Sequence, residues 1–482
     1  MPLFIKYYYC VVTAANPRRG ASVEESEEKL KRVGSVSRAR RARALLGVAA
    51  LSATVALSAC GSSDDDGAAT SASTTSGGGG APVEVRFASW VPNIRNAVEL
   101  FNREHRDIHV TLEEMTAGPD GGYAKLLSAV RAGNAPDVAQ VGYDQLPAFL
   151  IAGALEDVTE YAADDESKFI PWQWRQGVFG DKVYAIPQAS GPMAFYYRKD
   201  LFQRWGVEPP RTWDDFAAAA DRIKARGASI VTFPPTQAPF FMGLAQQAGQ
   251  QWFTPESDAW KVTVDNPDTQ RMAAYWQGLL DRRAVATMPD MSTEWYKALQ
   301  TGRVVGWIGA SWGDALLRQG APRTAGKWAV ADMPQWQAGG DVVSASWGGG
   351  SASAILRGTK NAEAATEFAV WLNSNLDSVN LLLTDGYGWP AVADPRQVTG
   401  LQDDPTVFKF YGGQNIWEVF ARADAGVDVD WAWPPTSGEL YASVTDELKK
   451  AVEGGSLPEA VRAVQSQAVA QLKAKNLSVA GE

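Results

Sequence analysis

Short strand patterns alternate with amphipathic helix patterns from Val83 onward. Val83–Ala88 predicts a strand, and Asn93 then caps a helix whose apolar residues are spaced i, i+3, i+4, i+7: Ile94, Ala97, Val98 and Phe101. A strand over Ile108–Leu112, a helix over Tyr123–Ala132 and a strand over Asp137–Val141 continue the alternation. This order predicts βαβ units and a parallel sheet, which places the chain in the α/β class.

Two later helices carry clear start signals. Thr212, with Asp215 three residues on, predicts an N-cap. Ser456, followed by Pro458 and Glu459, predicts the start of the last helix. That helix has one apolar stripe, made by Leu457, Val461, Val464, Ala468 and Leu472.

The first 82 residues have the pattern of an export signal and a tether. Basic residues precede an apolar run over Ala44–Ala59, which is shorter than the roughly 20 residues that span a membrane. The ending Leu57-Ser58-Ala59-Cys60 resembles a bacterial lipobox, in which the cysteine is acylated and holds the protein at a membrane. We therefore expect an N-terminal extension and lipoprotein signal peptide over 1–59. An acylated Cys60 and a flexible Gly/Ser/Thr-rich linker then occupy 60–82.

Charge and rare residues exclude several classes of function. Residues 1–59 hold ten Lys/Arg against four Asp/Glu, so the net charge of −10 leaves −16 on residues 60–482. Such an acidic chain argues against nucleic acid as a partner. With two cysteines and two histidines, at 105 and 109, we expect no disulfide, metal or cofactor.

One motif suggests a hydrolase. Gly309-Ala-Ser311-Trp-Gly313 matches the nucleophile elbow G-x-S-x-G, between a predicted strand over Arg303–Ile308 and a helix starting near Asp314. The hydrolase order needs a histidine further along the chain, and none follows His109. We therefore expect a tight turn that presents Trp312 to a cleft.

Several segments resemble the family 1 extracellular solute-binding proteins, the sugar receptors related to maltose-binding protein. The resemblance rests first on Val183–Pro187 (VYAIP), Phe195–Phe202 (FYYRKDLF) and Thr212–Phe216 (TWDDF). It continues in the same order and spacing through Ala135–Val138, Asp144, Gly153–Leu155, Gly309–Trp312, Trp347–Gly350, Trp389–Ala391 and Gly454–Ala460. Together these matches cover residues 83–475.

This resemblance implies a two-lobed periplasmic-binding-protein fold of type II, a Venus flytrap with three hinge crossings. The crossings are expected near Gln188–Ala194, Ser346–Ser353 and Ala391–Asp394. Lobe I then comprises 83–190 and 351–392, and lobe II comprises 191–350 and 393–482. Gly and Pro near the first two crossings favour local backbone freedom there.

A sugar needs aromatic planes for its C–H faces and polar groups for its hydroxyls. Candidates at expected strand ends and turns are Trp90, Asn93, Tyr143, Asp144, Trp312, Trp347, Trp389, Trp431 and Trp433. By the resemblance, Asp144 accepts sugar hydroxyls and Trp312 stacks on a ring. Other tryptophans are expected in the core, namely Trp172, Trp205, Trp213, Trp276 and Trp371.

The resemblance implies a substrate-binding lipoprotein of an ABC importer and not an enzyme. It would capture a carbohydrate, an oligosaccharide, and deliver it to the permease as a monomer anchored through Cys60 on the extracytoplasmic face. One alternative is a same-fold receptor for a polyol or a glycerol-phosphodiester, which needs Arg86, Arg95 or Arg422 turned inward. A second is a secreted glycosidase, since two well-placed carboxylates suffice for that chemistry.

Overall fold

The computed structural model of the chain describes residues 81–482, apart from 92–93, 117, 119–120, 257–258, 384–387, 429 and 482. The described residues belong to one unit that covers 78–482. The predicted helix cap Asn93, the lipobox Cys60 and the signal run lie outside the described residues.

The first part of the sheet follows the predicted βαβ order. Strand β1 (Val83–Ser89) pairs in parallel with β2 (Ile108–Glu114) and with β3 (Val138–Gly142). Helix α3 (Ile94–Glu104) joins β1 to β2 and buries the four residues of its predicted stripe. Helix α4 (Gly122–Arg131) joins β2 to β3, so these elements are confirmed to within two residues at each end.

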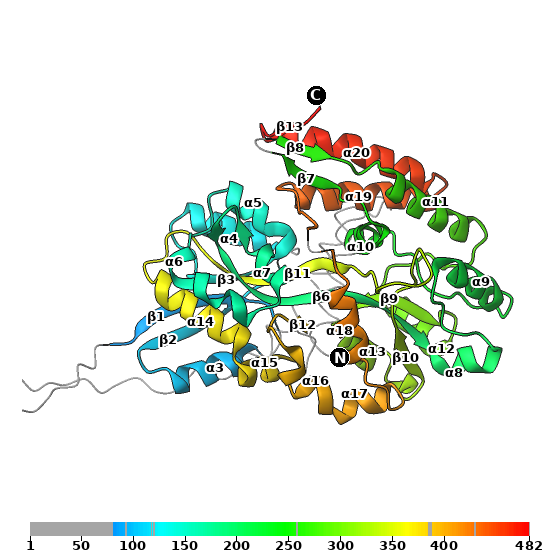
Figure 1. Ribbon diagram of the computed structural model, residues 1–482, viewed down its shortest axis with the longest axis horizontal. Coiled ribbons are helices and arrows are strands. Elements are labelled where there is room, and N and C mark those ends of the chain that lie inside the picture. The colour runs from blue at the N-terminus through cyan, green and yellow to red at the C-terminus, as the bar shows by residue number, and fades with distance from the viewer. Residues whose placement is uncertain are drawn as a thin grey trace, which may run out of the picture. The chain divides into compact units, whose positions relative to one another are not determined.

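The centre of the sheet is antiparallel, which corrects the expectation of a parallel sheet. The long strand β6 (Ala185–Arg198) pairs antiparallel with β11 (Ser346–Ile355) along its first half. Along its second half it pairs antiparallel with β9 (Gly306–Ala310) and β10 (Trp328–Ala331) (Figure 1). The strand order is β10-β6-β11-β3-β1-β2, so only the β1–β3 part is parallel.

The three predicted hinge crossings fall on segments that meet in this sheet. The first lies on β6, the second on β11, and the third follows the short strand β12 (Trp389–Pro390). Both β11 and β12 pair with β6 at Ala189 and Ser190. The crossings and the lobe boundaries themselves stay predictions.

The remaining elements surround this sheet. Up to residue 250 they are α5 (Leu146–Ile151), α6 (Thr159–Ala162), α7 (Pro171–Gln176), β4 (Val178–Phe179), β5 (Lys182–Val183), α8 (Lys199–Trp205), α9 (Trp213–Lys224) and α10 (Ala238–Ala248). Beyond it they are β7 (Phe253–Glu256), β8 (Ala259–Val262), α11 (Pro267–Asp281), α12 (Thr293–Thr301), α13 (Gly313–Gly320), α14 (Ala362–Ser374), α15 (Leu376–Leu383), α16 (Gly400–Asp403), α17 (Pro405–Phe410), α18 (Trp417–Ala425), α19 (Ser437–Val452), α20 (Leu457–Ala474) and β13 (Ser478–Val479). Within the described residues there are also four short 3₁₀ helices, η2 (Tyr143–Gln145), η3 (Ala163–Lys168), η4 (Pro322–Thr324) and η5 (Pro395–Gln397).

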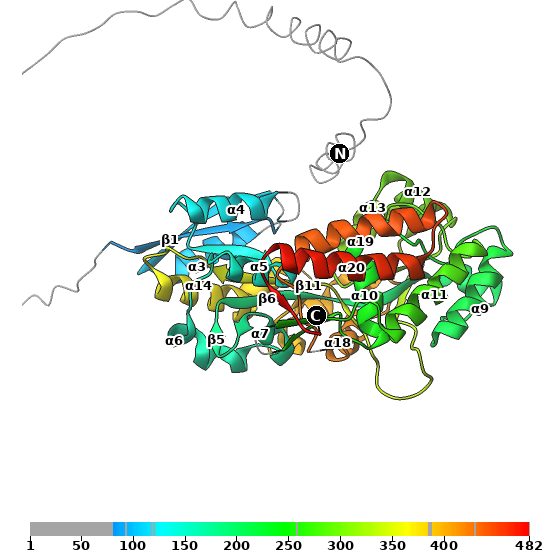
Figure 2. The ribbon, with the colours of Figure 1, turned by 90° about the horizontal axis from the view of Figure 1, so that it is seen from above.

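The predicted caps form. Thr212 Oγ1 accepts the Asp215 N–H at 3.0 Å, and the Asp215 carboxylate accepts the Thr212 N–H at 3.1 Å, which closes a capping box at α9. Ser456 caps α20 by accepting the Glu459 N–H, and the predicted stripe of that helix is buried. Figure 2 shows α20 lying beside α19, so the stripe is covered by its neighbour along the chain.

Across the described part of the chain, no helix combines the length and apolar character that crossing a membrane requires.

Candidate functional site

A run of three glycines at the start of β11 lies between aromatic side chains from η2, from α19 and from the loop between α18 and α19. Gly348 and Gly349 have φ angles of 62° and 78°, a region that favours glycine. A Cβ on Gly349 would lie 3.1 Å from Trp433 Nε1 and 3.3 Å from Tyr143 Cβ. A Cβ on Gly348 would lie 3.8 Å from the Tyr441 hydroxyl. We call Gly348–Gly350 the glycine strand.

Two predicted stacking residues form a pair at the head of the glycine strand. The rings of Trp312 and Trp347 meet edge to face, with centroids 5.6 Å apart and planes at 85°. Gly191 of β6 lies against both, since a Cβ there would be 3.1 Å from Trp312 Nε1 and 3.3 Å from the Trp347 carbonyl oxygen. Trp347 is buried and Trp312 is half-buried, so Trp312 keeps part of its ring available.

Asp144 and two tyrosines make a polar group beside the glycine strand. Asp144 is 8% exposed, accepts the Gln145 amide at 2.8 Å and faces the Tyr441 phenol. Burial raises the pKa of Asp144 to about 6, although its interactions with Gln145 and Tyr441 act in the opposite direction. Burial and the nearby Asp144 carboxylate likewise raise the pKa of Tyr123 and of Tyr441 above the usual tyrosine value. Such a group can accept hydrogen bonds from the hydroxyls of a neutral ligand.

Trp90 extends this group. Its half-buried ring meets Tyr123 edge to face at 5.9 Å, and the Tyr123 hydroxyl accepts the Gly142 N–H at 3.0 Å. The Trp90 backbone N–H donates to Gln140 at 3.2 Å. Tyr123 therefore lies near both Trp90 and Asp144, and the role of Trp90 in a ligand site stays a prediction.

Trp431 and Trp433 lie near each other but face different surroundings. Their rings are 6.2 Å apart at 73°, and both are buried. Trp433 contacts the glycine strand, whereas Trp431 also packs on Trp252 of the core at 6.2 Å. The indole N–H of Trp431 is buried without a hydrogen-bond partner among the described residues.

Trp389 lies in the core cluster against which Trp312 also packs. It is 3% exposed and pairs with Ser190 through β12, within a core cluster that includes Val379 and Val398. No ring pair within the described residues joins Trp389 to another predicted tryptophan. Its place in a ligand site stays a prediction.

A buried network that the sequence did not indicate lies behind Tyr143. The Tyr143 hydroxyl donates to Gln173 at 3.2 Å, and the Gln173 amide donates to Ser190 at 3.0 Å. Ser190 donates to Asp424 at 2.8 Å, and Trp172, expected to be a simple core residue, donates its indole N–H to Asp424 at 3.3 Å. These partners are far apart in sequence, so spacing could not reveal them.

Tyr441 is another residue that sequence reasoning missed. It lies in α19 next to the buried Leu440, where it looks like part of an ordinary apolar face. Tyr441 is half-buried, and its phenol gains meaning only because Asp144 faces it, so no local pattern in the sequence indicated it.

The G-x-S-x-G motif has a packing explanation. A Cβ on Gly309 or Gly313 would lie 2.6 or 2.2 Å from the ring of Trp307, so both glycines make room for that indole. Ser311 is 1% exposed, and the helix α13 begins at Gly313, near the predicted position. His105 stacks on Phe101 at 3.9 Å, and the described residues contain no cluster of three metal-ligating side chains.

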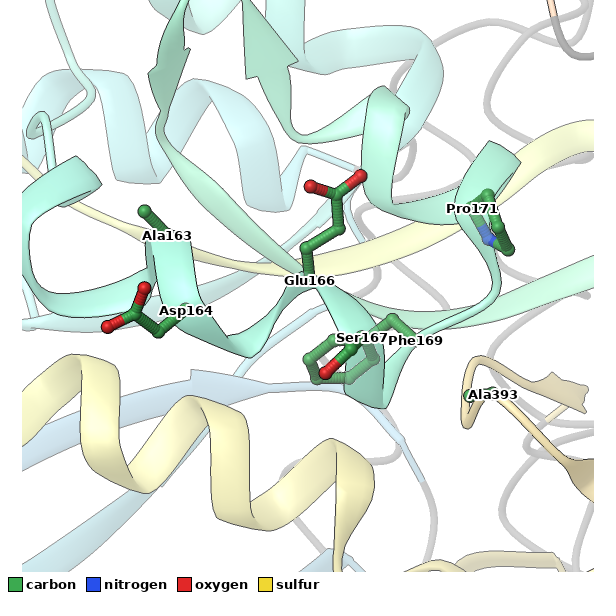
Figure 3. Close-up of a pocket in the computed structure, with 7 residues that line it drawn as sticks. All are labelled: Ala163, Asp164, Glu166, Ser167, Phe169, Pro171 and Ala393. Atoms are coloured by element: carbon green, nitrogen blue, oxygen red, sulfur yellow. The ribbon is translucent and has the colours of Figure 1, made fainter.

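A hollow of about 630 Å³ lies elsewhere on the surface (Figure 3). It is lined by Ala163, Asp164, Glu166, Ser167, Phe169, Pro171 and Ala393. None of the predicted site residues is in that lining, so the hollow is separate from the glycine strand.

The three arginines that a phosphodiester or polyol receptor would need form ion pairs near the surface. Arg86 pairs with Glu113 at 2.6 Å, and its side chain is 40% exposed. Arg95 pairs with Glu114 at 2.6 Å, and Arg422 with Asp332 at 3.1 Å. These exposed pairs give no support to an anionic ligand site.

Comparison with known proteins identifies the family. The family described as bacterial extracellular solute-binding protein matches residues 81–375. The chain belongs to this family. A similar curated protein is the arabinooligosaccharide-binding protein of Halalkalibacterium halodurans, 24% identical over 338 residues, which are 67% of this chain and 74% of the relative.

Two solved structures of binding proteins resemble this solute-binding protein closely in fold. The galacto-N-biose-/lacto-N-biose I-binding protein of the Bifidobacterium longum ABC transporter is 28% identical with a TM-score of 0.75, and the match covers 83% of this chain and all of that one. An ABC-transporter-associated binding protein of B. animalis subsp. lactis, solved with β-1,6-galactobiose, is 28% identical with a TM-score of 0.69, over 83% and 99%. The two-lobed α/β fold expected from the sequence is thereby confirmed.

Proposed function

We propose that this solute-binding protein captures an oligosaccharide beside the glycine strand and delivers it to the permease of an ABC importer. The observation that carries the proposal is the half-buried Trp312 ring, edge to face with Trp347, in a protein where Tyr441 lies against the same glycine strand and faces Asp144. Aromatic planes and nearby acceptors are what a sugar's faces and hydroxyls require. The relatives named for sugars support the same class of ligand.

Binding follows from these parts. A pyranose face packs on Trp312, and its hydroxyls donate to the Asp144 carboxylate, which is buried and therefore bonds strongly. Closing two lobes over the sugar removes water from these contacts and presents a distinct shape to the permease. Micromolar capture corresponds to about −8 kcal/mol, within reach of a few stacked rings and roughly ten hydrogen bonds.

The protein works at the extracytoplasmic face of the membrane, held by acyl chains on Cys60. The lipobox pattern and the Gly/Ser-rich segment after it support this placement. In the monomer, the flexible linker over 60–82 lets the binding domain reach both free sugar and the permease.

The protein does no chemistry on its ligand. Ser311 is buried against the Trp307 packing, and no histidine follows residue 109. Purified protein incubated with oligosaccharides and nitrophenyl esters should release no product. Turnover that Ser311→Ala abolishes would instead support a hydrolase.

A thermal-shift screen tests the proposal. The full chain with Cys60→Ser, purified without lipid, is melted with lacto-N-biose, β-1,6-galactobiose, arabino-oligosaccharides, polyols and glycerophosphodiesters. A ligand at 100 times its Kd should raise the free energy of unfolding by about 2.7 kcal/mol. Stabilisation by a glycerophosphodiester and by none of the sugars would contradict an oligosaccharide receptor.

A further inference from the structure

Trp307 lies at the centre of the aromatic residues that support the candidate site. Its ring, carried by β9, is 6.0 Å from Trp312 and 6.4 Å from Trp347. On its other sides it stacks on Tyr196 at 5.4 Å and meets Trp295 at 5.2 Å. Any tilt of this buried indole would therefore reach both members of the Trp312–Trp347 pair.

The glycines of the turn fix only part of the orientation of Trp307. The backbone at Gly309 and Gly313 lies so close to the ring that a Cβ at either position would overlap it, and this backbone blocks movement of the ring in its direction. This packing still leaves the Trp307 ring free to slide within its own plane. The Trp307 indole N–H removes that freedom by donating to Asp290 Oδ2 at 2.9 Å.

Asp290 is a buried carboxyl whose two oxygens each accept a hydrogen bond. It is 3% exposed, and its second oxygen accepts the hydroxyl of Thr232. It lies on the loop between α11 and α12, next to Met291, whose φ of 62° is unusual for a residue with a side chain. Burying a carboxyl costs free energy, so we expect Asp290 to do more than fill space.

We infer that Asp290 is a positioning residue for the ligand site: through Trp307 it holds the Trp312–Trp347 pair in its edge-to-face arrangement. The role of that pair in binding sugar rests on the proposed function. The mechanical link from Asp290 to the pair does not, since it follows from contacts within the protein.

The carboxyl has a property that makes this link measurable. The groups that face Asp290 are the Thr232 hydroxyl and the Trp307 indole, and neither carries a charge. Burial raises the pKa of Asp290 to about 7, while the two hydrogen bonds act in the opposite direction. The carboxyl therefore changes charge near neutral pH, and the ionised form is the stronger acceptor.

Fluorine NMR on 5-fluorotryptophan-labelled full chain with Cys60→Ser tests the link without any ligand. Trp312→Phe and Trp347→Phe assign the two signals. Asp290→Asn and Trp307→Phe should each shift the signals of Trp312 and Trp347. The double variant should shift them no further than Trp307→Phe alone, because both substitutions remove the same hydrogen bond. Between pH 5.5 and 8.5 the unsubstituted signals should titrate near pH 7, and those of Asp290→Asn should not.

A matched control is Asp137→Asn. Asp137 also accepts a threonine hydroxyl, that of Thr359 at 2.6 Å, and a backbone N–H, that of Arg86 at 2.8 Å, but it lies at β3. It should leave the Trp312 and Trp347 signals unchanged. If Asp290→Asn does not fold by far-UV circular dichroism, Thr232→Val serves instead and should shift the same signals. Unmoved signals in the folded variant, or additive shifts in the double variant, would overturn the inference.

Titration with lacto-N-biose and β-1,6-galactobiose adds a second readout. Asp290→Asn should weaken whichever sugar binds by about 3- to 10-fold, which corresponds to about 0.7–1.4 kcal/mol. If neither sugar binds even the unsubstituted chain, it is the proposed function that fails for these ligands, and the fluorine spectra still decide the role of Asp290.

Discussion

Ser190 donates a hydrogen bond of 2.8 Å to Asp424, a residue 234 positions further along the chain. Ser190 is in the middle of β6, where both β11 and β12 pair with that strand. Trp172 and Gln173 of α7 complete the surroundings of the carboxyl. Burial raises the pKa of Asp424 to about 7, against the lowering effect of these hydrogen bonds. An acid that titrates near neutral pH thus joins α7, β6 and α18.

Stability should therefore depend on pH through Asp424. Its folded-state pKa of about 7 lies above the unfolded value of about 3.9, so the folded chain binds more protons between these values. The free energy of unfolding falls as pH rises from about 4 to about 7, by up to about 1.4 kcal/mol per unit. Asp144 and Asp290 act in the same direction. Asp424→Asn should flatten this fall, measured by urea unfolding at pH 5 and pH 8.

Asp430→Asn is the control for that measurement. Asp430 is six residues from Asp424 but its side chain is 70% exposed, in an ion pair with Arg175. It should leave the pH dependence unchanged, because surface pairs contribute little. An equal flattening by both variants would mean that Asp424 is solvated in the folded protein.

Trp312→Ala and Asp144→Ala should each weaken the binding of the sugar found in the screen by about 10- to 100-fold. Losing a stacked ring costs on the order of 1–3 kcal/mol by analogy with stacked bases, and losing a buried acceptor costs a similar amount. Isothermal titration measures the affinity, and melting without ligand measures the effect on folding. Trp371→Ala is the matched control, since Trp371 is also a half-buried indole but packs on Phe101 and His105. Unchanged affinity in Trp312→Ala would show that its ring belongs to the core.

Local patterns predicted the helices and strands well, because each depends on neighbours a few residues apart. The stripe of α3 and the capping box of α9 form as expected. The antiparallel centre of the sheet was not predicted, since the pairing of β6 with β11 joins residues more than 150 positions apart and short apolar strands do not show their direction. Only the resemblance to a family supplied the two-lobed fold.

Several of the residues that the sequence indicated lie together, although their role in a ligand site stays a prediction. Loop position and neighbouring Gly or Pro indicated Trp312, Trp347 and Trp433, which lie at or beside the glycine strand, and their role in binding stays a prediction. The same signals indicated Trp389, which is buried in a core cluster as Trp347 and Trp433 are, and its role in binding likewise stays a prediction. Tyr441 and Asp424 gave no local signal, because their chemistry arises only when distant elements bring partners to them.

Cys60→Ser should release the protein from the membrane fraction into the medium. Without acyl chains, the segment that remains after export has nothing to hold it at the bilayer. Immunoblots of membrane and medium fractions measure the change, and Cys10→Ser, which affects the other cysteine of the chain, should leave the protein in the membrane fraction. Retention of the Cys60→Ser protein would indicate that Ala44–Ala59 is a spanning segment.

Gly349→Ala should separate the glycine strand's role in binding from its role in folding. Gly349 has a φ of 78°, so alanine there costs about 1–2 kcal/mol of stability. Its Cβ would also press on Trp433 at 3.1 Å and on Tyr143 at 3.3 Å, moving both by a few tenths of an ångström.

Gly340→Ala is its matched control, with a φ of 96° and nothing within 4 Å of the added Cβ. Both variants should lose similar stability by urea unfolding, since both place alanine in the left-handed region. Only Gly349→Ala should bind the sugar more weakly, by several-fold in isothermal titration, because small displacements of packed groups lose contacts with a bound ring. If the two variants keep the same affinity, Trp433 and Tyr143 do not contact the ligand, and the binding surface is restricted to the Trp312 and Asp144 side of the glycine strand.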